Sequence, residues 1–360
     1  MKRTLLFCSL LFLSCIFTYP QIPPGYYDSA EGLSGQALQE ALHDIIKDHI
    51  SVDYGTLYSY FETTDSKPGS VVWDMYSDVP GGTPPYIYHY NSGQECGNYD
   101  SEGDCFNREH SWPNSWFGGE VYPMYSDLFM VYPTDGYVNN RRGNYPYGEV
   151  QVAGWTSQNG SKVGGNSTPG YSGTVFEPVD EYKGDFARTY FYVSTRYYTE
   201  DAGWPGSDMT TGSQLLPWAL DMMLEWNISD PVSQKETDRN NVVYPVQNNR
   251  NPFIDHPEYA DLIWGPGSGV QGNPETQGIR IYPNPCIDEV CILIPGNYPG
   301  SFFHPELIGI SGNHLPAFFY SRGNQICISV RSLSSGIYLI LLSSPGNVIA
   351  YRGYFIKQRE

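Results

Sequence analysis

The amino-acid sequence predicts an α+β protein with two folded parts, a larger mixed part and a small C-terminal β-sandwich. Three observations lead to this prediction. Up to residue 264, segments with helical spacing of apolar residues alternate with turns rich in Gly, Pro and Asn. Residues 265–278 are rich in Gly and have the composition of a linker. From residue 279 onward, short β-type runs alternate with turn residues.

Length and composition favour a globular, extracellular protein. The 360 residues are enough for two domains, and 40% of them are hydrophobic, which is enough to build a core. The chain is rich in aromatic residues, with 31 Tyr and 8 Trp, and only 16% of its residues are charged. This composition favours a folded, loop-rich protein over a disordered one.

The net charge of −19 argues against a protein that scans duplex nucleic acid with a basic surface. An enzyme that holds a single phosphate through a metal ion and a few arginines remains compatible with this charge. On charge alone, a nuclease is disfavoured.

Residues 1–20 have the pattern of a secretory signal peptide. Lys2 and Arg3 precede an almost wholly apolar run from Leu5 to Phe17, which is shorter than the roughly 20 residues of a membrane span. We predict no transmembrane segment and a secreted or cell-surface protein. The predicted domains are a signal peptide at 1–20, a catalytic domain at 21–264, a linker at 265–278 and a C-terminal domain at 279–360.

Cysteine usage agrees with an oxidising compartment. Cys96 and Cys105 bracket a loop rich in Gly, Asn and Asp, and we predict a disulfide bond between them, with two free thiols as the alternative. Cys286, Cys291 and Cys327 form an odd set in the C-terminal domain, so at least one of them should be unpaired there.

Periodicity and turn residues predict the main elements. Helices are expected at 34–50 with Ser34 as cap, at 185–198, at 213–227, and from Asp230 to about 241 with Asp230 as cap. Strands are expected at 70–76 and 86–90 in the larger part. In the C-terminal part we expect strands at 279–282, 290–294, 307–310, 325–330, 337–342 and 348–356.

The stretch from Cys105 to Gly118 carries the residues best suited to catalysis. Glu109 and His110 are adjacent, with Arg108 before them and Pro113 after. A carboxylate can hold a hard cation such as Mg²⁺, and a neutral histidine can accept a proton near pH 7. A metal ion and a base are the minimum requirement for hydrolysing a phosphodiester. A Glu-His dipeptide alone is too common to indicate this chemistry.

The longer string Arg-Glu-His-x-x-Pro, followed by an aromatic residue, Phe and Gly, resembles the endonuclease I family of secreted nucleases. The segment from Asp127 to Val150 resembles the second motif of that family, and the resemblance covers roughly residues 26–264. It implies a ββα-metal nuclease core with surrounding helices and loops. It also implies a secreted, metal-dependent endonuclease that hydrolyses DNA with little sequence specificity and leaves 5′-phosphate ends. Whether RNA is also a substrate is left open by the resemblance.

The resemblance assigns roles to three residues. His110 matches the general base, Glu109 the carboxylate that holds the divalent ion, and Asn139 the amide that completes the protein ligands. The implied ion is Mg²⁺, or another divalent cation such as Mn²⁺ or Ca²⁺. The structural alternatives are a surface ion pair between Glu109 and Arg108, and a turn or helix cap for Asn139.

Two arginines are further catalytic candidates from the same resemblance. Arg142 follows Asn139 by three residues, and Arg188 matches an arginine in a later helix. Either can contact phosphate or brace the site through a buried carboxylate. Residues 117–127 lack the further arginine that some family members carry. Phe129 and Met130 stand where the family often has His or Asn, and their expected role is packing in the core.

One geometric constraint applies to the first motif. Adjacent residues of a regular strand point to opposite faces, so such a strand cannot direct Glu109 and His110 into one pocket. We therefore expect a bend or a strand end at this position, near Pro113.

The C-terminal part resembles a type IX secretion sorting domain through three short motifs: Ile281-Tyr282-Pro283-Asn284-Pro285, Ser335-Gly336-Ile337-Tyr338-Leu339 and a basic end. It implies the type IX secretion machinery as a partner of residues 279–360. Two alternatives to the nuclease prediction are a phosphodiesterase acting on smaller nucleotides and a surface-displayed binding protein with a degenerate nuclease fold. The acidic charge and Met130 favour the second of these.

Overall fold

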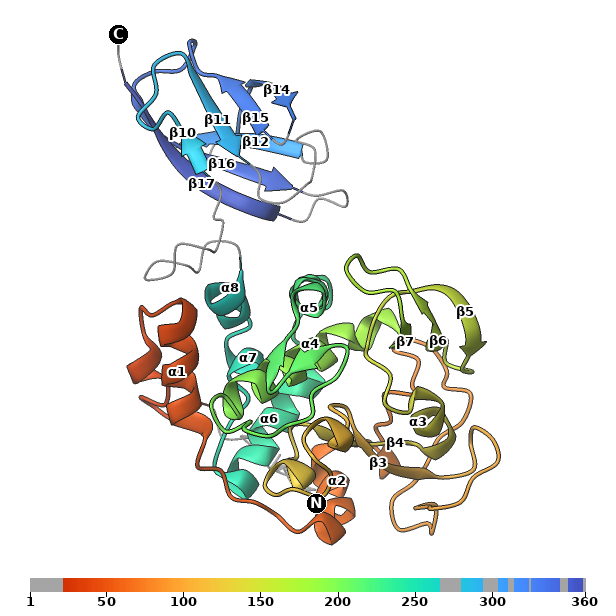
Figure 1. Ribbon diagram of the computed structural model, residues 1–360. Coiled ribbons are helices and arrows are strands. Elements are labelled where there is room, and N and C mark those ends of the chain that lie inside the picture. The colour runs from red at the N-terminus through yellow and green to blue at the C-terminus, as the bar shows by residue number, and fades with distance from the viewer. Residues whose placement is uncertain are drawn as a thin grey trace, which may run out of the picture.

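The computed structural model describes residues 22–265, 280–293, 304–309, 314–323, 325–343 and 349–358. The predicted signal peptide at 1–20 and almost all of the predicted linker at 265–278 lie outside these residues. No helix within the described ranges is both long enough and apolar enough to cross a bilayer. The fold is α+β, as predicted (Figure 1).

In residues 22–265, a buried central helix separates a helical side from a strand-rich side (Figure 1). This helix, α4, runs from Lys183 to Arg196 and is buried along its whole length. The other helices are α1 Gly35–Ile46, α2 Leu57–Thr64, α3 Gly136–Arg142, α5 Pro217–Ser229, α6 Gln234–Gln247, α7 Pro252–Asp255 and α8 Glu258–Trp264. Short 3-10 turns are η1 Asp28–Ala30, η2 Tyr54–Thr56, η3 Asn114–Trp116, η4 Met124–Ser126 and η5 Asp180–Tyr182.

The predicted helices are confirmed in type, with differences at their ends. The helix predicted at 34–50 is α1, which follows Ser34 and ends at Ile46. The helix predicted at 213–227 begins only at Pro217, a residue suited to the first helical position. The prediction of a helix starting at Asp230 was wrong. Instead Ser233 and Glu236 form a capping box at the start of α6, which satisfies the first amide groups better than Asp230 could.

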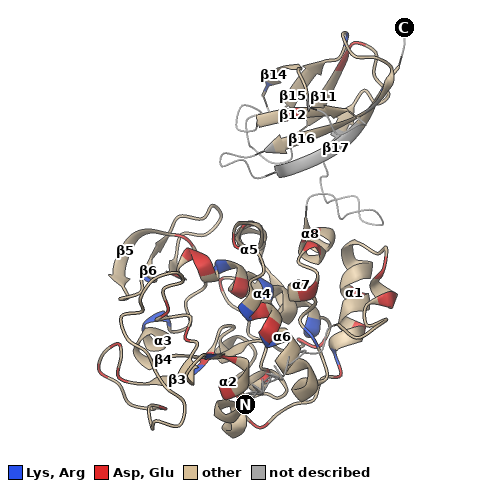
Figure 2. Ribbon diagram, turned by 180° about the vertical axis from the view of Figure 1, so that it is seen from behind, with Lys and Arg blue, Asp and Glu red and all other residues tan. Residues whose placement is uncertain are grey.

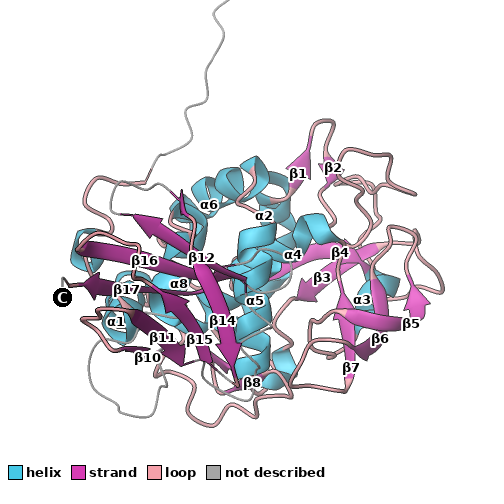
Figure 3. Cartoon of the chain, turned by 90° about the horizontal axis from the view of Figure 1, so that it is seen from above, coloured by secondary structure: helices cyan, strands magenta, loops and turns pink. Residues whose placement is uncertain are grey.

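The strands of this part are short. They are β1 Ser66–Lys67, β2 Val71–Val72, β3 Phe106–His110, β4 Val131–Asp135, β5 Val150–Thr156, β6 Lys162–Asn166, β7 Thr174–Glu177, β8 Thr210–Thr211 and β9 Gln214–Leu215. They form the sheets β1-β2, β3-β4, β5-β6-β7 and β8-β9 (Figure 3).

The strand predictions for 70–76 and 86–90 were largely wrong. Only β2 forms in the first segment, and the second contributes a single bridge, from His89 to Val71. The side chain of Asp74 accepts a hydrogen bond from the backbone N–H of Tyr76 at 2.8 Å. Such a local bond competes with the extended chain and turns it, although the apolar alternation favours a strand.

Residues 280–358 contain two four-stranded antiparallel sheets with a shared apolar core, and the predicted strands are all found there. The sheet orders are β10-β11-β15-β14 and β13-β12-β16-β17. The strands are β10 Arg280–Tyr282, β11 Glu289–Leu293, β12 His304–Gly309, β13 His314–Leu315, β14 Phe318–Arg322, β15 Gln325–Ser329, β16 Gly336–Ser343 and β17 Ile349–Lys357. Strands β13 and β14 were not predicted. Cys291 and Cys327 form a disulfide between β11 and β15, and Cys286 is a buried free thiol.

The predicted disulfide between Cys96 and Cys105 is confirmed, and it lies where β3 meets the start of α3. The backbone N–H of Gly136 donates to the carbonyl of Cys105 at 2.9 Å. A Cβ atom at position 136 would lie 3.1 Å from Sγ of Cys96 and 2.7 Å from the ring of Tyr99. Glycine is therefore required for the disulfide loop to pack on the first turn of α3.

Candidate active site

Strands β3 and β4 and helix α3 form one continuous ββα unit (Figure 1). The strands pair antiparallel without a bulge, with Glu109 opposite Tyr132 and His110 opposite Val131. Helix α3 begins directly after β4, and Asp135 caps it by accepting the N–H of Val138 at 2.8 Å.

Two polar contacts join β3 to α3. Nδ2 of Asn139 donates to Oδ1 of Asn107 at 2.8 Å, and Nη1 of Arg142 donates to Oε1 of Glu109 at 2.8 Å. Asn107 and Glu109 are two apart on a strand, and Asn139 and Arg142 are three apart on a helix, so each pair shares one face. The structure thus brings Asn139 and Glu109, both predicted metal ligands, to the same interface between strand and helix.

Glu109 is buried and contacts both a hydroxyl and a guanidinium. Its Oε1 also accepts a hydrogen bond from the Tyr76 hydroxyl at 2.9 Å, whereas no donor in the described part of the chain reaches Oε2. Burial raises the pKa of Glu109 to about 7, against the opposing effect of the Arg142 charge. The suggested ion pair of Glu109 with Arg108 on the surface was wrong, since its cationic partner is Arg142 and the pair is buried.

Arg142 braces the end of β3. Besides Glu109, its guanidinium donates to the carbonyl of His110 at 2.9 Å and to the carbonyl of Ser111 at 2.6 Å. The Tyr190 hydroxyl from α4 donates to the same Ser111 carbonyl at 2.8 Å. The Arg142 side chain is almost fully buried, so this geometry favours bracing over contact with phosphate.

His110 lies on the opposite face of β3 from Glu109, because the strand is regular up to its last residue. The expected strand end is found at His110, and no bend brings the two side chains into one pocket. The imidazole stacks on Tyr125, with ring centroids 5.1 Å apart, and on Tyr54 at 5.7 Å. Nε2 lies 2.9 Å from the backbone carbonyl of Tyr125.

That carbonyl fixes the tautomer of His110. A carbonyl can only accept, so Nε2 carries the proton and Nδ1 keeps its lone pair. Burial lowers the pKa of His110 to about 4, helped by the charges of Arg108 and Arg142 and opposed by the Tyr125 carbonyl. The histidine is therefore neutral at pH 7 and able to accept a proton through Nδ1.

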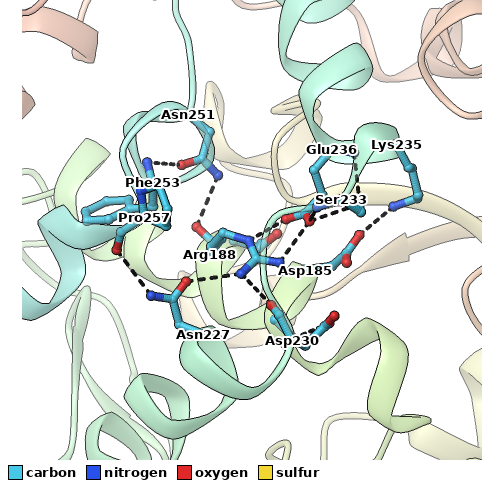
Figure 4. Close-up of polar contacts among 12 residues, drawn as sticks. Asp185, Arg188, Asn227, Asp230, Ser233, Lys235, Glu236, Asn251, Phe253 and Pro257 are labelled. Carbon is cyan, nitrogen blue, oxygen red and sulfur yellow. Dashed lines mark hydrogen bonds and ion pairs between the residues drawn. The ribbon is translucent and has the colours of Figure 1, made fainter.

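Arg188 is not brought to this unit. Its guanidinium donates to both carboxylate oxygens of Glu236, with Nη2 to Oε2 at 2.8 Å, and to Asn227 at 3.1 Å (Figure 4). It also donates to the carbonyl of Asp230 at 2.8 Å. These partners lie on α5, on α6 and between them. The side chain is completely buried, so its placement supports the bracing alternative and argues against the catalytic role predicted for it.

Sequence reasoning missed several residues around the site. Asn107 could have been found, because the two-residue period of a strand puts it on the same face as Glu109. Tyr76, Tyr54 and Tyr125 come from distant turns, and no spacing in the sequence links them to the motif. Phe129 and Met130 are buried in the core of this part, as expected.

Comparison with known proteins identifies a family for each of the two parts of the chain. The family model of endonuclease I matches residues 34–258, and that of a secretion-system C-terminal sorting domain matches residues 280–352. An extracellular ribonuclease of Bacillus amyloliquefaciens is 38% identical over 248 residues, which cover 66% of this chain and 78% of the relative. An extracellular ribonuclease of Bacillus subtilis (strain 168) is 37% identical over the same shares. An endonuclease-1 of Buchnera aphidicola subsp. Baizongia pistaciae is 26% identical over 129 residues, 36% of this chain and 46% of the relative. The chain therefore belongs to the endonuclease I family and is a secreted or cell-surface nuclease with a C-terminal sorting domain.

Proposed function

We propose that this protein is a divalent-metal-dependent endonuclease that hydrolyses both DNA and RNA with little sequence specificity and leaves 5′-phosphate ends. The observation that carries the proposal is the pair of contacts between β3 and α3. They hold a carboxylate and an amide at one interface between strand and helix. The next residue along β3, on the other face of the strand, is a histidine whose tautomer is fixed for accepting a proton.

The oxygens at this interface fit a hard cation. Oε2 of Glu109 and Oδ1 of Asn139 accept no hydrogen bond from any residue that the structure describes. Both oxygens therefore have lone pairs free to bind a cation. Carboxylate and amide oxygens are ligands that Mg²⁺, Mn²⁺ and Ca²⁺ accept, and Mg²⁺ in particular needs few protein groups because it keeps several waters. Mg²⁺ is the ion we propose.

The bound ion would neutralise charge on the scissile phosphate and help the leaving oxygen to depart. The residues of the chain perform the remaining steps. His110 accepts the proton of the attacking water at Nδ1 while Tyr125 holds Nε2–H. Arg142 and Tyr76 fix the Glu109 carboxylate. Attack of water on phosphorus breaks the bond to the 3′ oxygen, which takes a proton from solvent water, and the phosphate stays on the 5′ end of the product.

The substrate class follows from the groups at the site and from the relatives. The proposed ligands and base act on a phosphodiester, which is common to DNA and RNA and carries no sequence information. The two Bacillus relatives are described as ribonucleases and the Buchnera relative as an endonuclease. This supports RNA as a substrate alongside DNA.

A cleavage assay on two substrates tests the proposal. Supercoiled plasmid and a long single-stranded RNA are incubated with the purified protein, with chelator, and with chelator followed by excess Mg²⁺. We expect both to be cut, cleavage to stop with chelator and to return with Mg²⁺, and the products to be labelled by a kinase only after phosphatase treatment. Cleavage that persists with chelator would rule out a metal-dependent reaction. If only one of the two nucleic acids is cut, the substrate class is that nucleic acid alone.

A further inference from the structure

Most cations of residues 22–265 are already used within the protein. Every lysine and arginine in this range forms an ion pair with a carboxylate, except Arg108 and Arg141. In a chain with a net charge of −19, two arginines without an acidic partner are unusual. A paired cation contributes little to anion binding, because its carboxylate neutralises it.

Both unpaired arginines belong to the ββα unit. Arg108 lies on β3 two residues before His110 and therefore on the same face as that histidine. Arg141 lies on α3 between Asn139 and Arg142, and its side chain is exposed. Figure 2 shows, in blue, that both β3 and α3 carry basic residues. The two free charges are thus on the same strand and helix as the proposed ligands and base.

Each guanidinium is held in place by aromatic rings. Cζ of Arg108 lies 3.9 Å from the ring centroid of Tyr54 and 4.8 Å from that of Tyr58, and its Nη1 donates to the Tyr54 carbonyl at 2.8 Å. Cζ of Arg141 lies 5.2 Å from the ring centroid of Trp155. Stacking on a ring orients the planar group and leaves N–H donors at its edge for a phosphate.

We propose that Arg108 and Arg141 are the residues of the ββα unit that bind backbone phosphates of the nucleic acid. This inference rests on the proposed function. The two charges let an acidic protein hold its substrate at one place without a general basic surface. They also supply phosphate contacts in a chain whose residues 117–127 contain no arginine.

Salt dependence of binding is the direct test. Each phosphate neutralised by a cation adds about 0.7 (single strand) to 0.9 (duplex) to the slope of log affinity against log salt concentration. With two contacts, the affinity of the wild type should fall roughly tenfold between about 50 and 200 mM salt. Binding is measured by fluorescence anisotropy with a labelled DNA oligonucleotide and its RNA counterpart, in chelator so that no cleavage occurs.

The variants are Arg108→Gln, Arg141→Gln and the double variant, with Lys47→Gln as control. Lys47 is the residue that follows α1, and it forms an ion pair with Asp44. Its replacement therefore removes one positive charge at a position outside the ββα unit. We expect each arginine variant to lower the slope by roughly 0.7 to 0.9 and to raise KM with little change in kcat. The double variant should lose most of the salt dependence, and Lys47→Gln should match the wild type.

Lysine replacements separate charge from structure. Arg108→Lys and Arg141→Lys keep the charge and should restore the slope even where the lost stacking lowers thermal stability. The inference is overturned if the wild type cuts nucleic acid but the salt dependence of binding is unchanged in both glutamine variants. It is also overturned if Lys47→Gln lowers the salt dependence as much as the arginine variants do. A wild type that neither binds nor cuts would instead overturn the proposed function.

Discussion

Glu109 and His110 are neighbours in the sequence, and their pKa values are shifted in opposite directions by the same cause. Burial opposes the charged form of each group, so it raises the pKa of the acid to about 7 and lowers that of the base to about 4. Between these values the carboxyl group is largely protonated and the imidazole is neutral. The base is therefore ready over a wide pH range, whereas the carboxylate is available only near and above pH 7.

This difference predicts how cleavage depends on pH. A protonated Glu109 cannot hold a cation, so protons compete with metal below its pKa. The Mg²⁺ concentration for half-maximal cleavage should rise as pH falls from 7 to 5, by about tenfold per pH unit. At saturating Mg²⁺ the rate should stay nearly flat down to about pH 5, because His110 remains neutral. Metal titrations at several pH values measure both. A rate that falls with a midpoint near 6.5 at saturating metal would contradict the lowered pKa of His110.

The proposed ligands give a second prediction at this scale. Glu109→Ala and Asn139→Ala each remove an oxygen ligand and should shift the Mg²⁺ titration to higher concentration, by roughly ten- to a hundredfold. Asn140→Ala is the matched control, because Asn140 is adjacent on α3 and exposed. If Asn139→Ala titrates like Asn140→Ala, the amide is not a ligand.

At the scale of elements, α4 connects the site to the rest of the protein. The Tyr190 hydroxyl donates a hydrogen bond to the Ser111 carbonyl, just after β3. Arg188, two residues earlier on α4, connects this helix to α6 through its ion pair with Glu236 (Figure 4). Asn251 at the start of α7 donates to the Arg188 carbonyl at 3.1 Å. The position of β3 thus depends on helices that contribute nothing to the chemistry.

The role of Arg188 can be separated from catalysis. Replacing it with Met leaves the buried Glu236 without its cation, which typically costs about 3–5 kcal/mol of unfolding free energy. Arg188→Met/Glu236→Gln removes both charges, keeps the capping group of α6, and should recover part of that loss. Denaturant unfolding measures both variants, and kcat of the folded fraction should stay near wild type. A large fall in kcat at unchanged stability would restore the catalytic role.

The sequence predicted elements well where local signals and tertiary contacts agree. Apolar spacing identified α1 and α4, and alternation identified the strands of the C-terminal sandwich. Local signals failed at 73–76, where the Asp74 side chain turns the chain, and at Asp230, where a capping box lies three residues later. At the site, the motif located Glu109, His110 and Asn139. It could not show that Arg142 and Arg188 are buried, since their carboxylate and carbonyl partners come from remote elements.

At the scale of the whole molecule, the protein has two separate apolar cores, one in each of the two segments that match a family. One core lies within residues 22–265 and the other within residues 280–358, and all the proposed ligands, the base and the phosphate-binding arginines belong to the first. Each core is closed by contacts within its own range. The two parts should therefore fold independently.

A truncated protein tests this independence. A chain that ends at Pro266 should unfold at a temperature close to that of the catalytic part in the full chain, and should cut DNA at close to the full rate. Thermal unfolding followed by calorimetry should show the loss of one transition in the truncated protein. An unfolded or inactive product would mean that residues 279–360 share an interface with the enzyme.

The central claim is that His110, neutral and held by Tyr125, takes a proton from water in a metal-dependent cut. His110→Ala removes this base, and His89→Ala, at an exposed position, is the matched control. The measurement is the rate of plasmid nicking at saturating Mg²⁺, with thermal unfolding to confirm the fold. We predict a loss of about 10²–10⁴-fold for His110→Ala, with oligonucleotide binding retained, and wild-type rates for His89→Ala. A folded His110→Ala protein that nicks plasmid at the wild-type rate would contradict the account.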